Sequence, residues 1–523
     1  MSRNVLLWAG GIALLTVTIS SVLNASSDTK LEDIQQLILK GDLAAAKAHL
    51  NEFLQESPGN ADALNFLGVV QAHEGEYRAA EKSFRNAIAA APAFVGAYLN
   101  LGRLYQEGGK NIPQALQKGI AVYESVLRLN PFNEEATYQC ALLLAMAGSY
   151  ERSSKLLSRL PEPERQRPQA LALAVADHAG MKHCKRGEEN TSRLLLHPDL
   201  AQADVVTVLP IILAQHNDKL AVQLLAGLEQ RGLASVDVIH QLGLLYEQEG
   251  DFHLARATLE EEVQKTAVAT VPTLLVLARV ASKERAYKEA LGYLAHARDI
   301  APQDARVHFF FGMVCVEIDL QQEAFQSLKT AVQLEPDNPY FNYVFGVVMM
   351  SRKAAMEGYP YLKKYCELKP DDPKGRLALG EAYFYGGDDE LARKELKTVV
   401  NDSRTSATAR LFLGRLANRE GNSAEAIANL REAIRKNPSS ADAYAELGLA
   451  YRKRQDYVKA EDSLLKALKI DPDNYAANLS LTVVYELTKD SRAEKQRVRL
   501  NEIQQLRKDR EKEFLSMVEV RPY

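Results

Sequence analysis

One short stretch brings together side chains that can bind a metal ion. The sequence "DHAGMKHCKR" places His178, His183 and Cys184 close together, and imidazole and thiolate groups are common zinc ligands. His178 and His183 are five residues apart, so on a helix they do not share a face as residues three or four apart would. We therefore predict no metal site here and expect packed or solvated side chains.

No other stretch supplies a recognisable catalytic motif. The sequence contains no glycine-rich phosphate loop, no HExxH zinc motif and no GxSxG nucleophile motif. Neighbouring acids, such as Glu260, Glu261 and Glu262 or Asp371 and Asp372, are typical of exposed helix ends and turns. The sequence thus predicts no catalytic residue, no metal and no cofactor, and it favours a protein that is not an enzyme.

The four cysteines are far apart in the chain. They are Cys140, Cys184, Cys315 and Cys366. A disulfide needs its two Cα atoms within about 7 Å, and distant parts of an extended array rarely meet that condition. We expect four free thiols that mostly pack as small apolar residues.

The elements that position these residues follow a fixed pattern. Residues 441–474, "ADAYAELGLAYRKRQDYVKAEDSLLKALKIDPDN", have apolar residues three and four apart in two runs, with a break at "KRQD". This periodicity predicts two helices joined by a turn, and Pro472 ends the second helix. Because a single hairpin leaves one apolar side bare, it needs a neighbour of the same kind.

Such neighbours follow in steps of 34 residues. Counting back from Pro472 reaches Pro438, Arg404, Pro370, Pro336 and Pro302. Position eight of each unit is small: Gly448, Gly414, Gly380, Gly346, Gly312 and Ala278. Position twenty is small as well: Ala460, Ala426, Ala392, Gly358, Ala324 and Ala290. Small residues at both positions let the two helix backbones approach each other closely.

This pattern resembles the tetratricopeptide repeat family, whose unit is a helix-turn-helix of about 34 residues. The resemblance also covers residues 27–166, where "GGKNI" is a lengthened loop, and is most regular over 236–474. It is weakest over 167–235, where we predict two degenerate helical repeats. The resemblance implies an all-α, right-handed superhelical solenoid of about fourteen repeats.

The two ends of the chain differ from the repeats. Residues 1–26 hold Arg3 and then a run without charge over residues 5–23, which predicts a signal peptide or an N-terminal membrane anchor. Either would export the repeats to a periplasmic or extracellular location; a buried N-terminal helix is the alternative. Residues 475–523 read as capping helices with Val498, Ile503 and Leu506 on one apolar side, or as a coiled-coil seam.

In the resembling family, positions two, five, nine, twelve and thirteen of each first helix face an inner groove. Between residues 305 and 385 these positions carry an aromatic and methionine strip: Phe309, Met313, Tyr340, Tyr343, Val347, Met350, Phe384 and Tyr385. Between 407 and 453 they carry Arg415, Asn418, Arg419, Arg452 and Lys453. We expect these two patches to bind an extended or helical segment of a partner protein that carries acidic residues.

The family's carboxylate clamp cannot be carried over to this chain. Lys374 holds position two of its unit, but Ala378 stands at position six, and the two preceding units put Phe309, Met313 and Val344 at the remaining clamp positions. Ala378, Phe309, Met313 and Val344 cannot hold a carboxylate.

The composition gives no reason to expect nucleic-acid binding. The net charge of -4 provides no basic footprint for nucleic acid.

Two function classes follow from these observations. The first is a non-enzymatic protein-protein interaction scaffold in an envelope-associated, secretion or export assembly. The alternative is a substrate-selecting accessory subunit of a separately encoded glycan-processing or protein-modifying enzyme. The sequence does not specify the oligomeric state.

Overall fold

The computed structural model describes residues 25–109, 111–266, 269–351 and 355–518. Within these ranges the only regular secondary structure is helical, in 29 helices. No helix in the described part of the chain is long and apolar enough to cross a membrane. Nearly all of the predicted signal peptide or anchor, residues 1–26, lies outside the described residues; Ala25 and Ser26 begin the first helix.

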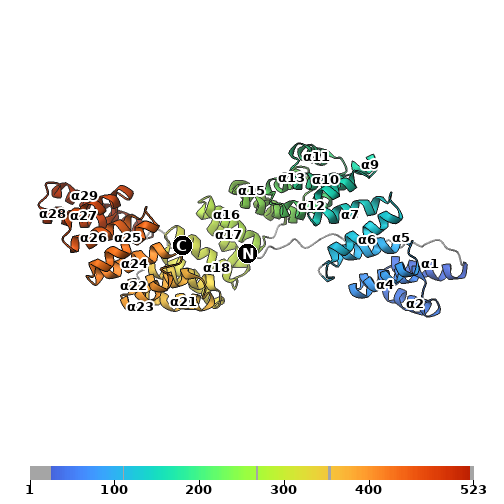
Figure 1. Cartoon of the computed structure of the whole chain (residues 1–523), viewed down its shortest axis with the longest axis horizontal. Helices are drawn as coiled ribbons and strands as arrows, with labels where there is room; N and C mark the ends of the chain where they lie inside the picture. Colours follow the sequence, from blue (N-terminus) through green and yellow to red (C-terminus); the bar gives the residue numbers. More distant parts are fainter. Residues whose placement is uncertain (1–24, 110, 267–268, 352–354, 519–523) are drawn as a thin grey trace. The chain divides into compact units, whose positions relative to one another are not determined.

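The helices form two compact units, which meet in the chain between Thr266 and Ala267. Figure 1 labels most of them along the chain. Unit 1 contains α1 (Ala25–Leu39), α2 (Leu43–Glu56), α3 (Ala61–His73), α4 (Tyr77–Ala90), α5 (Val95–Glu107), α6 (Ala115–Leu129), α7 (Glu134–Met146), α8 (Tyr150–Leu157), α9 (Glu162–Arg165), α10 (Pro168–Gly180), α11 (Cys184–Leu196), α12 (Gln202–Ala214), α13 (Asp218–Gln230), α14 (Val236–Glu249) and α15 (Phe252–Thr266).

Unit 2 continues the same pattern with fourteen helices. They are α16 (Val271–Lys283), α17 (Tyr287–Ile300), α18 (Ala305–Glu317), α19 (Gln321–Leu334), α20 (Pro339–Ser351), α21 (Ala355–Leu368), α22 (Pro373–Gly386), α23 (Asp389–Val399), α24 (Ser406–Arg419), α25 (Ser423–Lys436), α26 (Ala441–Lys453), α27 (Tyr457–Ile470), α28 (Tyr475–Thr488) and α29 (Ala493–Val518).

Apart from the one-turn α9, consecutive helices form antiparallel pairs, joined by short connections except between α5 and α6. The pairs run from α1 with α2 to α28 with α29, so the described residues hold fourteen of them. The all-α architecture of about fourteen helix-turn-helix repeats is therefore confirmed. Two of these fourteen pairs, α10 with α11 and α12 with α13, come from the degenerate stretch. The predicted long loop separates α5 from α6.

The small residue at position eight has a steric cause. A Cβ atom placed on Gly448 would lie 2.5 Å from Leu464 Cγ, which belongs to the second helix of the same pair. Gly68 would meet the Phe84 ring at 2.6 Å, and Gly346 would meet Leu362 Cγ at 2.6 Å. The large residue at position twenty-four thus fills the space that a glycine at position eight leaves, as close packing of a protein interior requires.

The turn between the paired helices also has a fixed conformation. Its residue at position fifteen has a positive φ, between 55° and 87°, in twelve of the described pairs. Glycine occupies six of these turns, as at Gly421, because it adopts this left-handed region without steric cost. The other six carry larger residues: Lys182, His216, Arg285, Asp319, Gln455 and Lys489.

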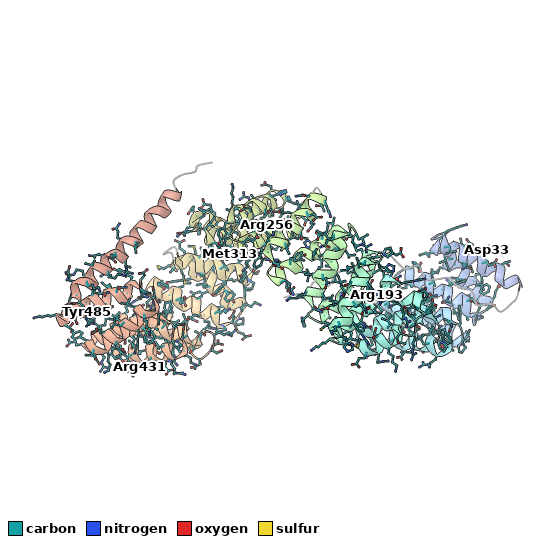
Figure 2. All side chains as sticks on the ribbon, turned by 90° about the horizontal axis from the view of Figure 1, so that it is seen from above. Asp33, Arg193, Arg256, Met313, Arg431 and Tyr485 are labelled. Atoms are coloured by element: carbon teal, nitrogen blue, oxygen red, sulfur yellow. The ribbon has the colours of Figure 1, made fainter. Side chains whose placement is uncertain are left out.

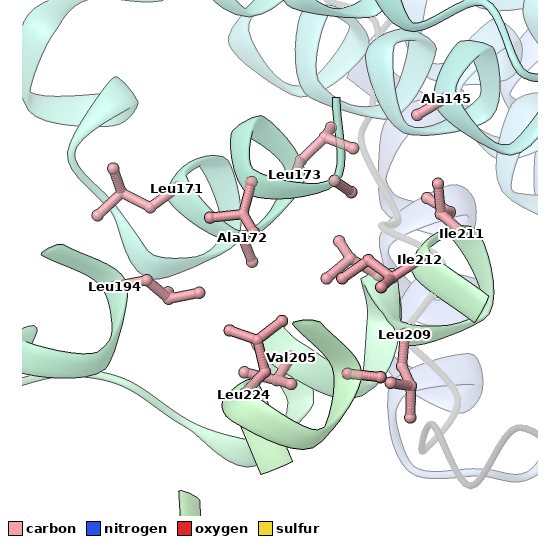
Figure 3. Packing of buried hydrophobic residues seen from close by; sticks show 14 of the residues in the cluster. Ala145, Leu171, Ala172, Leu173, Leu194, Val205, Leu209, Ile211, Ile212 and Leu224 are labelled. Carbon is pink, nitrogen blue, oxygen red and sulfur yellow. The ribbon is translucent and has the colours of Figure 1, made fainter. Parts of the chain in front are cut away.

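The degenerate repeats of unit 1 keep a continuous core. Leu173, Val205, Ile212 and Leu224 are fully buried there and come from α10, α12 and α13 (Figure 3). The carboxyl group of Asp177 is buried among these helices. Burial raises the pKa of Asp177 to about 8, because a charge in an apolar environment loses its hydration.

The last helix packs along α28 with its N-terminal half. Leu500 and Ile503 are buried, and Gln496 Nε2 donates to Asn478 Oδ1 at 2.8 Å. The apolar side predicted for this helix was wrong in part, because Val498 is 50% and Leu506 46% exposed. The helix buries Leu500 rather than Val498.

Candidate partner-binding surface

The candidate residues all lie on the first helices of unit 2, from α18 to α26. Neighbouring first helices contact one another directly, as α20 does with α22, α22 with α24 and α24 with α26. We call the residues at positions two, five, nine, twelve and thirteen of these helices the first-helix surface. Figure 2 shows the side chains of the chain, with Met313 labelled on this surface.

The aromatic strip begins between α18 and α20. Phe309 is buried, and its ring stacks on Phe341 with centroids 4.7 Å apart. Tyr340 lies beside Phe309 at 5.3 Å but is 59% exposed. Phe309 therefore supports the surface from within, whereas the ring of Tyr340 is open to a ligand.

The centre of the strip is half-buried. Tyr343 packs against Tyr365 with ring centroids 4.9 Å apart, and burial raises its pKa. Val347 and Met350 pack against the core of α21 to α24, while Met313 packs against the Phe309 core. These side chains hold the repeats together and also expose part of their apolar surface.

A second aromatic group joins α22 to α24. Phe384 contacts both Tyr385, at 5.4 Å, and Phe412, at 5.3 Å between ring centroids. Tyr385 is 58% exposed. The Arg419 guanidinium lies over the Phe384 ring, 4.0 Å from its centroid, and Arg415 lies 5.1 Å from that of Phe412. The aromatic and basic patches predicted separately thus meet in one place.

The arginines of this surface are paired within the chain. Arg415 Nη2 donates to Asp442 at 2.7 Å and its Nε to Glu446 at 3.3 Å. Arg419 pairs with Asp389 and also donates to the Phe384 carbonyl oxygen at 3.2 Å. The predicted basic patch is therefore largely offset by carboxylates from the neighbouring repeats.

The remaining polar candidates differ in their contacts. Asn418 is buried and donates to Glu446 Oε2 at 2.8 Å, while its backbone carbonyl oxygen accepts a hydrogen bond from Lys453. Arg452 is half-buried, and this burial lowers its pKa. Its guanidinium makes no hydrogen bond or ion pair with the described residues.

Sequence reasoning missed a carboxyl group on the same surface. Glu381 stands at position nine of α22, and burial raises its pKa to about 7, although the nearby Arg415 opposes this shift. Its charge therefore changes near neutral pH. The 34-residue spacing places Glu381 at a groove position and Asp442 at position two, so both could have been found from the sequence.

The stretch with His178, His183 and Cys184 lies elsewhere, in unit 1. The two imidazole rings lie 5.9 Å apart, and no group of three or more metal-binding side chains occurs among the residues that the structure describes. Of the cysteines, Cys140 and Cys315 are buried, Cys366 is half-buried and Cys184 is exposed. None of these residues extends the first-helix surface of unit 2.

Comparisons with known proteins agree with the repeat pattern. Models described as tetratricopeptide repeat match residues 40–93, 377–428 and 411–475, 112–176 and 236–261. A search of curated proteins finds no match.

Among solved structures, the chain is similar to a tetratricopeptide repeat protein from Parabacteroides merdae, with 14% identity and a TM-score of 0.41 over 48% of this chain and 98% of that chain. It is also similar to a chain of the APC/C hetero-tetramer Cut9-Hcn1, with 14% identity and a TM-score of 0.38 over 88% and 96%. PilF of Pseudomonas aeruginosa has 23% identity and a TM-score of 0.35 over 42% and 96%. The family models match helix pairs in both units, including α24 to α27 of the 34-residue pattern, and the chain is a tetratricopeptide-repeat protein.

Proposed function

We propose that the chain is a non-enzymatic scaffold that binds a segment of a partner protein on the first-helix surface of unit 2. The observation that carries this proposal is the exposure of Tyr340 and Tyr385 beside packed aromatic and methionine side chains. Aromatic and methionine residues are enriched in protein interfaces, where aromatic side chains often supply much of the contact energy. A tyrosine that is exposed but already packed against neighbouring side chains loses little conformational entropy when it binds a partner.

The ion pairs on this surface limit where an acidic partner residue could bind. Near Arg415 or Arg419 it would compete with Asp442, Glu446 or Asp389, which already hold the guanidinium groups. Arg452 makes no such pair with the described residues and offers less competition. A partner that needs a cation on this surface should therefore lose more affinity with Arg452→Gln than with Arg415→Gln.

We also propose that the scaffold acts outside the cytoplasm, in an envelope-associated, secretion or export assembly. The uncharged run over residues 5–23 after Arg3 supports export. The N-terminal sequence of the protein purified from its native cells tests this step. A mature chain that begins near Ser26, or an intact chain in the membrane fraction, supports export; an intact chain in the cytosol contradicts it.

The experiment for the scaffold proposal is crosslinking in native cells followed by purification from membrane and soluble fractions. A reproducible complex of several proteins that purifies with the wild type and is lost with Tyr340→Ala and Tyr385→Ala supports the proposal. Purification with one catalytic chain instead supports the accessory-subunit alternative. Unchanged recovery with both tyrosines replaced overturns the proposed surface.

A further inference from the structure

Two charged side chains of opposite sign on the first-helix surface of unit 2 are half-buried and lack a partner. Glu381 lies on α22 and Arg452 on α26, and neither side chain makes a hydrogen bond or ion pair with the described residues. Burial raises the pKa of Glu381 and lowers that of Arg452, because each charge loses part of its hydration. A ligand group of the opposite charge would offset this loss at either position.

The surroundings of Glu381 are acidic. Arg415 is the cation whose charge opposes the raised pKa of Glu381. Its guanidinium already binds Asp442 at 2.7 Å and Glu446 at 3.3 Å. Three carboxyl groups and one guanidinium therefore carry a net negative charge when Glu381 is ionised, which is complementary to a cation.

Other cations near this part of the surface do not pair with Glu381. Two are held by carboxylates, Arg419 by Asp389 and Arg376 by Glu395. Lys374 is exposed and stands two helical turns before Glu381 on α22, about 10 Å along the helix, which is too far for an ion pair. Glu381 is thus left for a cation that comes from outside the chain.

Around Arg452 the carboxylates are already engaged. Glu486 stands at the equivalent position of α28 and binds Arg497 at 2.8 Å. Glu446, on the same helix as Arg452, holds a guanidinium of α24. The adjacent Lys453 adds a second positive charge. A partner carboxylate at Arg452 would therefore not have to displace a carboxylate of the chain.

We propose that the partner segment carries a lysine or arginine that binds Glu381 and, further along, a carboxylate that binds Arg452. The inference rests on the proposed scaffold function and names the order of the partner's charges. The helices α22, α24 and α26 contact one another in turn, and packed helices lie about 8–10 Å apart, so two steps span about 16–20 Å. An extended chain covers this distance in about five to six residues.

The test uses the full chain and a displayed library of random twelve-residue peptides, since the natural partner is unidentified. Binding is measured at pH 8, where the Glu381 carboxyl, with a pKa raised to about 7, is largely ionised. We expect enriched peptides to carry Lys or Arg about five to six residues from Asp or Glu. Glu381→Gln and Arg452→Gln should each weaken their binding about tenfold, because a charge-assisted hydrogen bond to a half-buried group contributes more than an exposed ion pair.

Glu390→Gln and Arg435→Gln are the matched controls. Glu390 is exposed on α23 and Arg435 is exposed on α25, and both helices are second helices of unit 2. Each control removes the same charge as its counterpart and should leave peptide binding unchanged. Circular dichroism of all four variants checks that the fold is intact. Equal losses in the controls and in the surface variants would overturn the assigned positions.

Peptide variants test which charge lies at which side chain. Replacing the cationic residue of an enriched peptide by Gln should weaken binding to the wild type but cause little further loss in the Glu381→Gln variant. Replacing the acidic residue by its amide should behave in the same way with Arg452→Gln.

The outcomes separate this inference from the scaffold proposal. Peptides that bind through Tyr340 and Tyr385 but ignore both Glu381→Gln and Arg452→Gln would overturn this inference and leave the scaffold proposal standing. Dependence on only one of the two charged side chains would overturn the charge order. A library that yields no binding peptide would count against both proposals.

Discussion

The close approach of the paired helices in unit 2 can be tested by a single added methyl group. In Gly448→Ala the new Cβ would lie 2.5 Å from Leu464 Cγ and 3.2 Å from the Ala460 carbonyl oxygen. Cγ is the branch point of the leucine side chain, so the clash cannot be relieved by moving only its end. Overpacking of this kind costs about 1–3 kcal/mol.

Gly292→Ala supplies the matched control. Gly292 lies within α17, and a Cβ there would meet no atom within 4 Å. Alanine is a better helix former than glycine by about 1 kcal/mol, so this variant should gain stability. Relative to it, Gly448→Ala should be less stable by about 1–3 kcal/mol, which is the steric cost alone.

The measurement is differential scanning calorimetry of the full chain, with amide hydrogen exchange over residues 441–474 to localise the effect. Leu464→Ala alone should cost about 2–5 kcal/mol. It should cost less in a chain that already carries Gly448→Ala, because the shortened side chain makes room for the added methyl group. Equal stabilisation by Gly292→Ala and Gly448→Ala, with no coupling between positions 448 and 464, would refute the packing argument.

Three further outcomes follow from the structure. The pKa of Asp177 is raised to about 8 in the folded chain, so the stability that its bound proton contributes is complete below about pH 4 and is lost as the pH rises to about 8, by about 1 kcal/mol per pH unit. Thermal melts of Asp177→Asn should lack this decline, and those of the exposed Asp371→Asn should keep it. Gln455→Gly should raise the unfolding free energy in chemical denaturation by about 0.5–1 kcal/mol, because the φ of 62° at this turn suits glycine; a destabilised variant would contradict this. Tyr385→Ala should leave the melting temperature within a few degrees of the wild type and reduce partner recovery in quantitative pull-downs, while exposed Val458→Ala should change neither.

The repeat frame could be read from the sequence because packing imposes it on every unit. Gly448 and Leu464 touch within one helix pair, so their spacing recurs wherever the same contact recurs. Where this contact changes, the small residue at position eight is lost. At position eight of the degenerate repeats stand Val175 and Leu209, both buried, so the small-residue rule no longer identifies these units although their helices still pair.

The ion pairs of the candidate surface could not be predicted from the sequence. The family frame placed Arg415 and Arg419 on the correct helices, but their ion pairs depend on partners 27 to 31 residues away in neighbouring repeats. The offset between adjacent repeats determines these ion pairs, and it is set by packing rather than by local pattern. The division between Thr266 and Ala267 has no counterpart in the sequence pattern, since the repeat frame continues on both sides of it.

Site-specific photo-crosslinking in native cells tests the central claim most directly. A photoreactive amino acid is placed at Tyr340 or Tyr385 on the first-helix surface, and at Val458, which is 81% exposed on the second helix of its pair. The account predicts that the same partner protein is captured from positions 340 and 385 and not from position 458. Capture from position 458 alone, or equally from all three positions, would contradict it.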